Sequence, residues 1–283
     1  MKCPLCNSPE TNKFFTKVVY PTSQHYIESV HNKPFIHFKC KSCDFVFLPK
    51  PDELDLDEYY GKDWCKACEY EDQRQNLEKL FTRRLSDIAP YLNNRKILDV
   101  GCALGFSLKA YSENNFDAYG MEVSENSVMS ARKFTKFDVI QQTIEEPTPW
   151  ADDFFDAVTM FDVMEHLSKP TFALQEVNRI LKSNGILYIS TLNFDGIGRR
   201  LNTLEWRLLS PPGHMSYFSK KTLLSALKSK GFSIIKTRCF GLATNNKKLQ
   251  RIHSIMNRRL PKIEKLFELT SLGDYIDVIA RKS

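Results

Sequence analysis

A glycine-containing turn directly after an apolar run is the part of this sequence best suited to chemistry. Residues 96–105 read KILDVGCALG, and the apolar part has the composition of a buried parallel strand. Gly101 and Gly105 let the backbone pass close to a ligand in conformations that side chains forbid. The helix expected from Phe106 onward presents free N–H groups at its start. Glu122 ends the next apolar run, where an acid can accept hydrogen bonds from ribose hydroxyls. The layout predicts a nucleotide-like cofactor.

Alternating strand and helix patterns must position this turn, and they predict the α/β class. Helical spacing is found over residues 106–111 and 176–185. Further apolar, β-branched runs typical of strands are residues 119–123, 138–145, 154–161, 186–192 and 274–281. At 283 residues, the chain is long enough for one such core and a small accessory unit.

The motifs along this series resemble those of class I methyltransferases that use S-adenosylmethionine. Residues 99–105, DVGCALG, are similar to the D-x-G-x-G-x-G loop of that family, whereas the dinucleotide loop G-x-G-x-x-G needs a third glycine in step. Residues 155–167, FDAVTMFDVMEHL, are similar to the family's FDxVxxxxVLEHL, and residues 181–190 to its LKPGGxLxI. The family's middle glycine is Ala103 here, a substitution that we expect to be tolerated at negative φ.

The resemblance covers about residues 95–240 and implies a fold, a cofactor and a site. The fold is a Rossmann-like seven-stranded sheet whose last strand is antiparallel. The family seats adenine near Thr143, where it prefers an acid, and threonine accepts a hydrogen bond less strongly. The residues that the resemblance assigns to S-adenosyl-L-methionine are Asp99, Gly101, Cys102, Gly105, Glu122, Val123, Thr143, Ile144 and Phe161.

Two C-x-x-C pairs predict a metal site near the start of this sequence. Cys3 with Cys6 and Cys40 with Cys43 can each place two thiolates on one side of a tight turn, and two such pairs complete a tetrahedral zinc site. Four thiolates leave no open position for a substrate, so we expect this zinc to be structural. A third pair, Cys65 and Cys68, is explained equally well by helical i,i+3 spacing, which leaves its metal binding open.

The segment after the second pair extends the resemblance to a narrower group. Residues 44–60 are similar to the segment that precedes the catalytic domain in bacterial methyltransferases beginning CxxC…CxxCGxxFxxPxPxxxxLxxYY, a group linked to small metabolites, sugar nucleotides and surface glycans or lipids. We therefore divide the chain into three parts: a zinc-ribbon-like module (1–60), a bridging helical segment (61–94) and the methyltransferase domain (95–283). Within the last, residues of about 195–219 form a lid or substrate segment, and those of about 245–265 form a basic helical insertion.

Two histidines are candidates for catalysis. The family often has H-x-x-x-F-S before a late helix with the histidine facing the cleft, which makes His214 the first candidate for a general base or a substrate-orienting group. His166, beside Glu165 at the end of a strand, is the second candidate. The alternative for each is a structural role in which the ring only ties its loop by hydrogen bonds. The face of the bridging helix that carries Leu77, Leu80, Phe81, Leu85 and Ile88 is interpreted as core, without chemistry.

Charge and hydropathy restrict the partners. Residues 196–283 hold eighteen Lys or Arg against five acids, which favours a small or lipid-linked anionic acceptor, such as a sugar of a nucleotide sugar or surface glycan, and allows peripheral contact with a membrane. No apolar run reaches the length of a transmembrane span, and residues 1–6 lack a signal-peptide core, so we expect a cytoplasmic protein.

Two alternatives remain open at this point. One is an RNA methyltransferase that uses the zinc ribbon to bind nucleic acid, which is favoured less because no aromatic and basic platform for stacking bases is evident. The other is a cofactor-binding scaffold without catalysis, which the replacements at Ala103 and Thr143 would suit.

Overall fold

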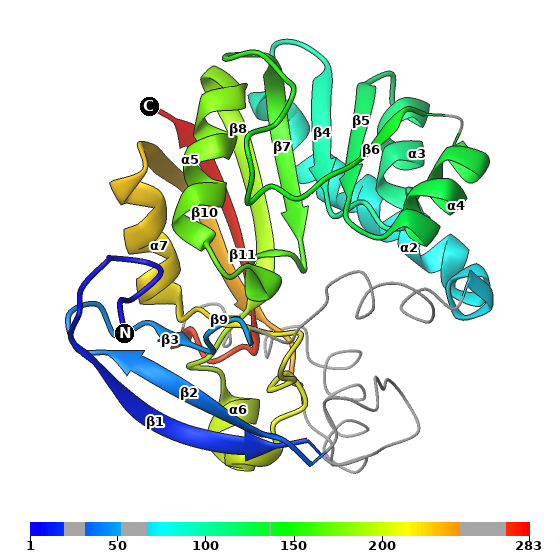
Figure 1. Ribbon diagram of the computed structural model, residues 1–283. Coiled ribbons are helices and arrows are strands. Elements are labelled where there is room, and N and C mark those ends of the chain that lie inside the picture. The colour runs from blue at the N-terminus through cyan, green and yellow to red at the C-terminus, as the bar shows by residue number, and fades with distance from the viewer. Residues whose placement is uncertain (20–31, 52–66, 136, 244–269) are drawn as a thin grey trace.

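The computed structural model describes residues 1–19, 32–51, 67–135, 137–243 and 270–283, with the backbone alone for 67–73. Its main feature is a seven-stranded sheet in the order β10-β11-β8-β7-β4-β5-β6 (Figure 1). The strands are β4 (Lys96–Val100), β5 (Asp117–Glu122), β6 (Val139–Gln141), β7 (Phe155–Phe161), β8 (Leu181–Leu192), β10 (Phe232–Phe240) and β11 (Tyr275–Lys282).

All neighbouring strands from β8 to β6 are parallel, whereas β11 runs antiparallel to both β8 and β10. The prediction of a Rossmann-like sheet with an antiparallel last strand is therefore confirmed. The helices of this part are α2 (Ala67–Ile88), α3 (Phe106–Glu113), α4 (Glu125–Thr135), α5 (Pro170–Ile180) and α7 (Lys220–Ser229), with the 3₁₀ turns η2 (Ala89–Tyr91) and η3 (Met164–His166).

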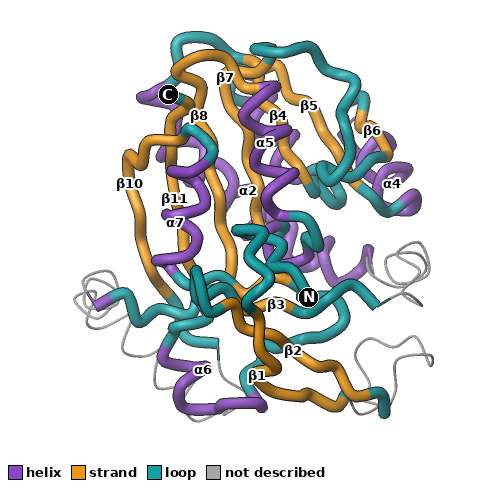
Figure 2. The backbone as a smooth tube through the Cα atoms, turned by 60° about the vertical axis from the view of Figure 1, so that its left-hand side comes forward, coloured by secondary structure: helices purple, strands orange, loops and turns teal. Residues whose placement is uncertain are grey.

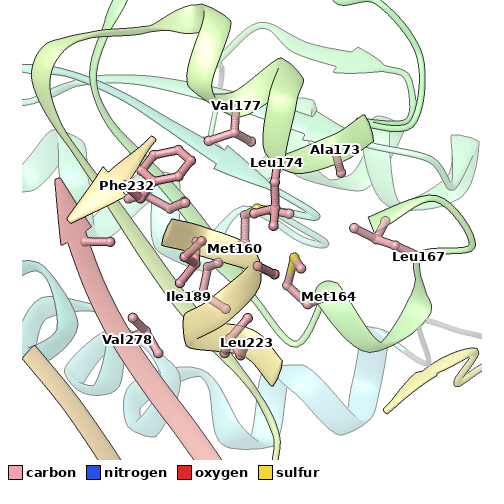
Figure 3. Close-up of a cluster of buried hydrophobic side chains, with 14 of the residues drawn as sticks. Met160, Met164, Leu167, Ala173, Leu174, Val177, Ile189, Leu223, Phe232 and Val278 are labelled. Carbon is pink, nitrogen blue, oxygen red and sulfur yellow. The ribbon is translucent and has the colours of Figure 1, made fainter. Parts of the chain in front are cut away.

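Helices cover both faces of the sheet because its central strands are apolar on both sides. In β4, Ile97 packs into one core with α2 and α3, and Leu98 packs into the other with α5 and α7. Figure 3 shows the second core, in which Leu174 of α5 and Leu223 of α7 surround Met160 of β7. The two cores hold the strand ends, and hence the loops that follow them, in fixed positions.

The order of the strands reverses between β4 and β7. From β4 the chain proceeds outward to β5 and β6, and it then returns to β7 and β8 on the other side of β4. Loops that leave the carboxyl ends of parallel strands on the two sides of such a reversal diverge and leave a crevice for ligands. The glycine turn follows β4, and the segment with His166 follows β7, so both flank this crevice.

A second, four-stranded sheet has the order β1-β2-β3-β9 and lies below the large sheet in Figures 1 and 2. Its strands β1 (Thr11–Val18), β2 (Pro34–Cys40) and β3 (Val46–Phe47) come from the predicted ribbon, but β9 (Ser216–Tyr217) comes from the predicted methyltransferase domain. The helical turns α6 (Ile197–Asn202) and η4 (Thr203–Glu205) lie between β8 and β9. Cys3, Cys40 and Phe45 also belong to the same core as Leu174 and Phe218. The described parts of the two predicted units thus share one sheet and one core.

The apolar stripe of α2 has two roles rather than one. Leu85 and Ile88 are buried against the sheet, as expected. Leu77, Leu80 and Phe81 line a pocket, and Phe81 also packs against this core, so our interpretation of the stripe as core without chemistry needs correction for these three residues. These three residues lie nearer the start of α2 than Leu85 and Ile88, and they share the pocket wall with Val100 and Gly101 at the carboxyl end of β4.

Some predictions fall outside the described residues. These are the thiols of Cys65 and Cys68 and the basic helical insertion at about 245–265. None of the helices within the described ranges is long and apolar enough to cross a membrane.

His37, in the small sheet, predicts an acid sensitivity of the fold. The ring is fully buried, stacks on Phe15 with the ring centroids 4.3 Å apart, and bonds to the Phe35 carbonyl through Nδ1 (3.2 Å). Burial lowers the pKa of His37 to about 4, whereas an unfolded histidine titrates near 6.5. Between these values only the unfolded chain binds the proton, so the free energy of unfolding decreases as pH falls through this window, by about 3 kcal/mol at its end.

Replacing His37 by phenylalanine should therefore make the free energy of unfolding less dependent on pH below pH 7. Denaturant unfolding at pH 7 and pH 4.5 measures the effect: between these pH values the variant should lose about 2–3 kcal/mol less than the wild type. The other buried histidines are common to both proteins and cancel in the comparison. Parallel pH profiles would show that His37 does not titrate with the expected shift.

Candidate active site

A pocket of about 320 Å³ opens at the reversal of strand order, within the roughly 300–1,000 Å³ typical of small-molecule sites. It brings together most of the residues that the sequence predicts for the site: Asp99, Gly101, Cys102, Glu122, Val123, Thr143, Ile144, Phe161 and His166. Gly105 and His214 are not among the lining residues. Further walls come from Leu77, Leu80, Phe81, Arg84, Val100, Ala103, Leu104, Phe106, Gln142, Glu145, Asp162, Val163 and Leu167.

The turn after β4 fits close against its surroundings. Gly101 has a φ of 71°, and a Cβ added there would lie 2.6 Å from Val163 Cγ2. Gly105 has a φ of 80°, and its Cβ would lie 2.7 Å from Thr135 Cγ2. Any side chain at these two positions would be strained and would clash, which explains glycine at both. Gly105 thus packs against α4 and does not line the pocket.

Ala103 also adopts a left-handed conformation, with a φ of 46°. The expectation of a negative φ here is wrong, because the turn keeps the backbone path that the family's glycine permits. An alanine in this region costs roughly 1–2 kcal/mol. The strained peptide aims Ala103 N–H at Glu122 Oε2, to which it donates a hydrogen bond of 3.0 Å. The turn therefore orients the acid that we expect to bind ribose.

Asp99 is buried at the end of β4 and braces the turn. Its carboxylate accepts hydrogen bonds from the hydroxyls of Ser107 at the start of α3 and Thr159 of β7, the latter at 2.6 Å. Burial raises the pKa of Asp99 to about 6, although both hydroxyls act in the opposite direction. The carboxylate fixes three elements relative to one another at the floor of the pocket.

Glu122 is held by the backbone alone. In addition to Ala103, the N–H groups of Val123 (2.8 Å) and Ser124 (3.0 Å) donate to Oε1. An ionised carboxylate has about four lone-pair positions, so capacity for a ligand hydroxyl remains at Oε2. This preorganised acid on the pocket wall, together with the close turn at Gly101, fits the ribose and the methionine part of S-adenosylmethionine.

The segment after β6 forms the wall where the resemblance places adenine. Thr143 Oγ1 accepts a hydrogen bond from the backbone N–H of Glu145 (3.1 Å), and Ile144 is buried beside it. The Glu145 carboxylate accepts from Ser168 Oγ and from Lys169 N–H, which ties this segment to the loop after β7. The contact of Thr143 with adenine stays a prediction.

Two charged residues on the pocket wall were missed by the sequence interpretation. Arg84 of α2 stacks on the Phe161 ring, with its guanidinium carbon 4.1 Å from the centroid, and donates to Ser190 Oγ (3.2 Å). Among the described residues that line the pocket it is the one Lys or Arg. Asp162 directly follows β7 and has a φ of 56°, and desolvation raises the pKa of its carboxyl. An arginine within an apolar stripe and an acid directly after an apolar strand are the signals that could have identified them.

Glu165, His166 and His214 lie together beside this wall, with a carboxylate oxygen and two ring nitrogens all within 4.8 Å of one another. His166 Nδ1 bonds to the Gly213 carbonyl (2.9 Å), and His214 Nδ1 to the Leu208 carbonyl (2.7 Å). Because a carbonyl oxygen only accepts, Nδ1 of each ring carries the proton, and Nε2 is the basic nitrogen in both. Burial raises the pKa of Glu165 to about 8, with the charge of Asp162 adding to the effect, which favours the protonated form of this carboxyl.

The two histidines do not keep the pKa of about 6.5 that is usual for this side chain. Burial lowers the pKa of His166 to about 3 and that of His214 to about 4. Both rings are therefore neutral throughout the physiological range. Only His166 reaches the pocket, whereas His214 packs its ring edge-on against His166 with the centroids 4.8 Å apart. The geometry makes His166 the first candidate for contact with a ligand and His214 its support.

The four predicted metal ligands form a compact cluster. Cys3 Sγ lies 3.7 Å from Cys43 Sγ, and Cys6 Sγ lies 3.6 Å from Cys40 Sγ, with all four atoms within 4.8 Å of one another. Four sulfur atoms bound at about 2.3 Å to one tetrahedral zinc lie roughly 3.8 Å apart, so the cluster has the dimensions that zinc requires. The Cys43 thiol, as a hydrogen-bond donor, lowers the pKa of Cys3 to about 5, which favours a thiolate at neutral pH.

Comparison with known proteins agrees with this geometry. A family model described as a methyltransferase domain matches residues 70–237, which is more than half of the chain. The ubiquinone biosynthesis O-methyltransferase of Pelagibacter ubique (strain HTCC1062) is 27% identical over 177 residues, which are 56% of this chain and 73% of that protein. The protein of the same description from Pasteurella multocida (strain Pm70) is 28% identical over 158 residues, 50% of this chain and 64% of that protein, so the match covers less than two thirds of this relative.

A solved structure, a SAM-dependent methyltransferase from Archaeoglobus fulgidus, shares the fold. It aligns with a TM-score of 0.55 at 20% identity and covers 77% of this chain and 100% of that one.

Proposed function

This chain belongs to the methyltransferase-domain family and is an S-adenosylmethionine-dependent methyltransferase, and we propose that it methylates a hydroxyl group of a small or lipid-linked anionic acceptor. The observation that carries the proposal is the neutral imidazole of His166 on the wall of the same pocket that contains Gly101 and Glu122. The names of the two curated relatives, both O-methyltransferases, support an oxygen atom as the acceptor.

In the proposed reaction, the protein aligns the acceptor with the methyl group and removes the proton of the acceptor hydroxyl. S-adenosylmethionine supplies an electrophilic methyl group on a sulfonium, so the protein mainly orients the acceptor in line and excludes water. A hydroxyl attacks better after it loses its proton, and His166 Nε2 is the proposed proton acceptor. His214 lies against His166 and fixes its ring, and the neutral Glu165 adds no competing charge. Glu122 would hold the ribose of the cofactor, and Asp162 lies on the wall of the same pocket.

Arg84 is the proposed partner of the cofactor's carboxylate, because it is the cation on the described pocket wall. Replacing it by methionine, which keeps an apolar stem over Phe161, should lower the affinity for S-adenosylmethionine by about 1.5–3 kcal/mol, roughly 10- to 150-fold. Calorimetry measures this change. Methylthioadenosine, which has no amino-acid part, is the matched probe and should bind both proteins equally. Equal losses for the two ligands would assign Arg84 to the fold of the pocket instead.

The anionic nature of the acceptor is supported by positive charge at the edge of the sheet where β4 and β8 end. The segment after β8 carries Arg199, Arg200 and Arg207, and it leaves the sheet at the same edge as the glycine turn. Arg199 is half-buried with its guanidinium carbon 4.2 Å from the Phe194 centroid, and desolvation lowers its pKa. A partly desolvated arginine gains from an anionic partner such as a phosphate. A sugar carried by a nucleoside diphosphate or by a lipid phosphate would satisfy both the hydroxyl and the charge.

Labelled methyl transfer to a panel of acceptors tests the proposal. The full-length protein is incubated with S-adenosylmethionine and, separately, nucleotide sugars, lipid-linked sugars, neutral sugars, phenols and RNA. We expect incorporation with an anionic sugar acceptor and a product whose methyl group is bound to oxygen. Incorporation into RNA alone would replace this proposal by that of an RNA methyltransferase.

The four thiolates are proposed to hold one structural zinc. Metal analysis of the purified protein should give about one zinc per chain, because a closed tetrahedral site binds a single ion. Replacing Cys40 and Cys43 together by serine should abolish the bound zinc. Ser8 and Ser42, whose exposed hydroxyls bond to each other at 2.8 Å beside the cluster, offer a control: their replacement by alanine should leave the zinc in place. Zinc retained by the double cysteine variant would place the metal elsewhere.

A further inference from the structure

The turn between Cys3 and Cys6 is hydrogen-bonded to α5, the helix that follows His166. Thr171 lies in the first turn of α5, and its hydroxyl lies 2.8 Å from the Pro4 carbonyl and 2.9 Å from the Leu5 carbonyl. Pro4 and Leu5 are the two residues between Cys3 and Cys6. The backbone of this turn is thus held by the metal ligands on one side and by α5 on the other.

The second cysteine pair is fastened to the segment that supports His166 from the opposite side. Three residues beyond Cys43, strand β3 pairs with β9, Val46 with Tyr217 and Phe47 with Ser216. Next to this pairing, Leu48 N–H donates to the Met215 carbonyl at 2.8 Å. Backbone hydrogen bonds therefore join the segment after Cys43 to β9.

Strand β9 and the residues before it hold the histidine loop directly. Met215 N–H donates to the Glu165 carbonyl (2.7 Å), and Ser216 Oγ donates to the Leu167 carbonyl (2.7 Å). Between these two, His166 Nδ1 donates to the Gly213 carbonyl. Each of the three consecutive residues from Glu165 to Leu167 is bound to the β9 segment, and α5 begins three residues later.

We infer that the cysteine cluster is a positioning device for the acceptor half of the active site: through Thr171 and through β9 it fixes the loop that carries His166. The inference rests on the proposed function in that His166 acts there on the acceptor. The cofactor half is built differently, since Glu122 and Gly101 are held by the backbone of the turn after β4 and of the end of β5, and these hydrogen bonds involve neither Thr171 nor β9. Loss of the metal should therefore disturb His166 and spare the binding of S-adenosylmethionine.

The first experiment follows the histidine rings by NMR in the full-length, zinc-loaded protein with labelled histidine, before and after zinc is removed by a chelator. The signals of His166 and His214, assigned with the variants His166→Asn and His214→Asn, should shift or broaden. Affinity for S-adenosylmethionine should change by less than about twofold, as for uncoupled sites. Unchanged ring signals would overturn the inference, and so would a loss of cofactor affinity in parallel with the ring signals, which would indicate general unfolding.

The second experiment leaves the cysteines intact. Thr171→Val removes the hydroxyl but keeps the shape, and a displaced His166 should lower acceptor turnover by roughly 10- to 100-fold, as misplacement of a reacting group does. Thr171→Ser keeps the hydroxyl and should restore turnover. Lys221→Met, which removes an exposed ion pair of 3.0 Å between α7 and Asp44 of the second turn, is the control and should have no effect.

The outcomes separate this inference from the proposed function. Equal turnover of Thr171→Val and the wild type, or equal loss in Thr171→Val and Thr171→Ser, overturns the positioning role. If no acceptor is methylated by the wild type, the proposed function fails, and the ring signals of His166 in the Thr171 variants still decide the inference. A purified protein without bound metal contradicts it outright.

Discussion

Replacing His166 by asparagine is expected to lower kcat by about 10²-fold, the low end of the loss for a general base, because burial lowers the pKa of this imidazole and makes it a weaker base. Asparagine can still offer an N–H donor near the position of Nδ1, so the tie to the Gly213 carbonyl can persist while the basic Nε2 is lost. Affinity for S-adenosylmethionine should change little, because Glu122 and Arg84 make the proposed cofactor contacts. Steady-state kinetics together with calorimetry measure the two effects.

The companion variant His214→Asn separates support from catalysis. His214 does not line the pocket, so its replacement should cost less than that of His166. If His166→Asn keeps near-normal turnover, the histidine only ties its loop, and alignment alone carries the reaction. A larger loss for His214→Asn would return the role of base to the residue that the sequence favoured.

The pH dependence follows from the same burial. The pKa values of His166 and His214 are lowered to about 3 and 4, so both rings are already neutral at pH 5. The sequence alone would predict a rate that rises with pH through an ordinary histidine titration. The structure instead predicts no step in kcat near pH 6.5.

Replacing Glu122 by alanine is expected to weaken the binding of S-adenosylmethionine by on the order of 2–4 kcal/mol, roughly 30- to 1,000-fold. The variant loses the charge-assisted hydrogen bonds to the ribose hydroxyls. It also leaves the N–H groups of Ala103, Val123 and Ser124 without their acceptor, so the turn loses its orientation. Calorimetric titration of the folded variant measures the loss.

Glu125, an exposed acid in the first turn of α4, provides the matched control for charge. Glu125→Ala removes the same side chain three residues away and should bind the cofactor normally. Normal affinity of Glu122→Ala would contradict the ribose assignment. Equal losses in both variants would attribute the effect to the field of the two carboxylates rather than to a contact.

The fold, and the gathering of the residues assigned to the cofactor around one pocket, could be predicted because their determinants are local. The apolar run before Gly101, the acid at the end of the next strand and the spacing of the Cys3 and Cys40 pairs each lie within a few residues. Backbone geometry converts such spacing directly into position, so the pocket contains nearly all the residues that the sequence assigned to the cofactor.

The acceptor half depends on contacts between distant segments, which spacing does not encode. The pairing of Val46 with Tyr217 joins residues far apart in the chain, and the adjacent Met215 and Ser216 bond to the loop that carries His166. The burial that lowers the pKa of His214 likewise arises from packing. In the sequence, Arg84 is one basic residue beside an apolar stripe. Only the packing of α2 beside the pocket shows that Arg84 lines the pocket wall.

A crystal structure with bound S-adenosylhomocysteine tests the assignment of the pocket most directly. We expect the ribose hydroxyls at hydrogen-bond distance from Glu122, the carboxylate on Arg84, and the sulfur directed toward the wall formed by Asp162 and His166. A ligand bound outside this pocket, or a ribose held by another residue while Glu122 keeps only its bonds from the N–H groups of Ala103, Val123 and Ser124, would contradict this assignment.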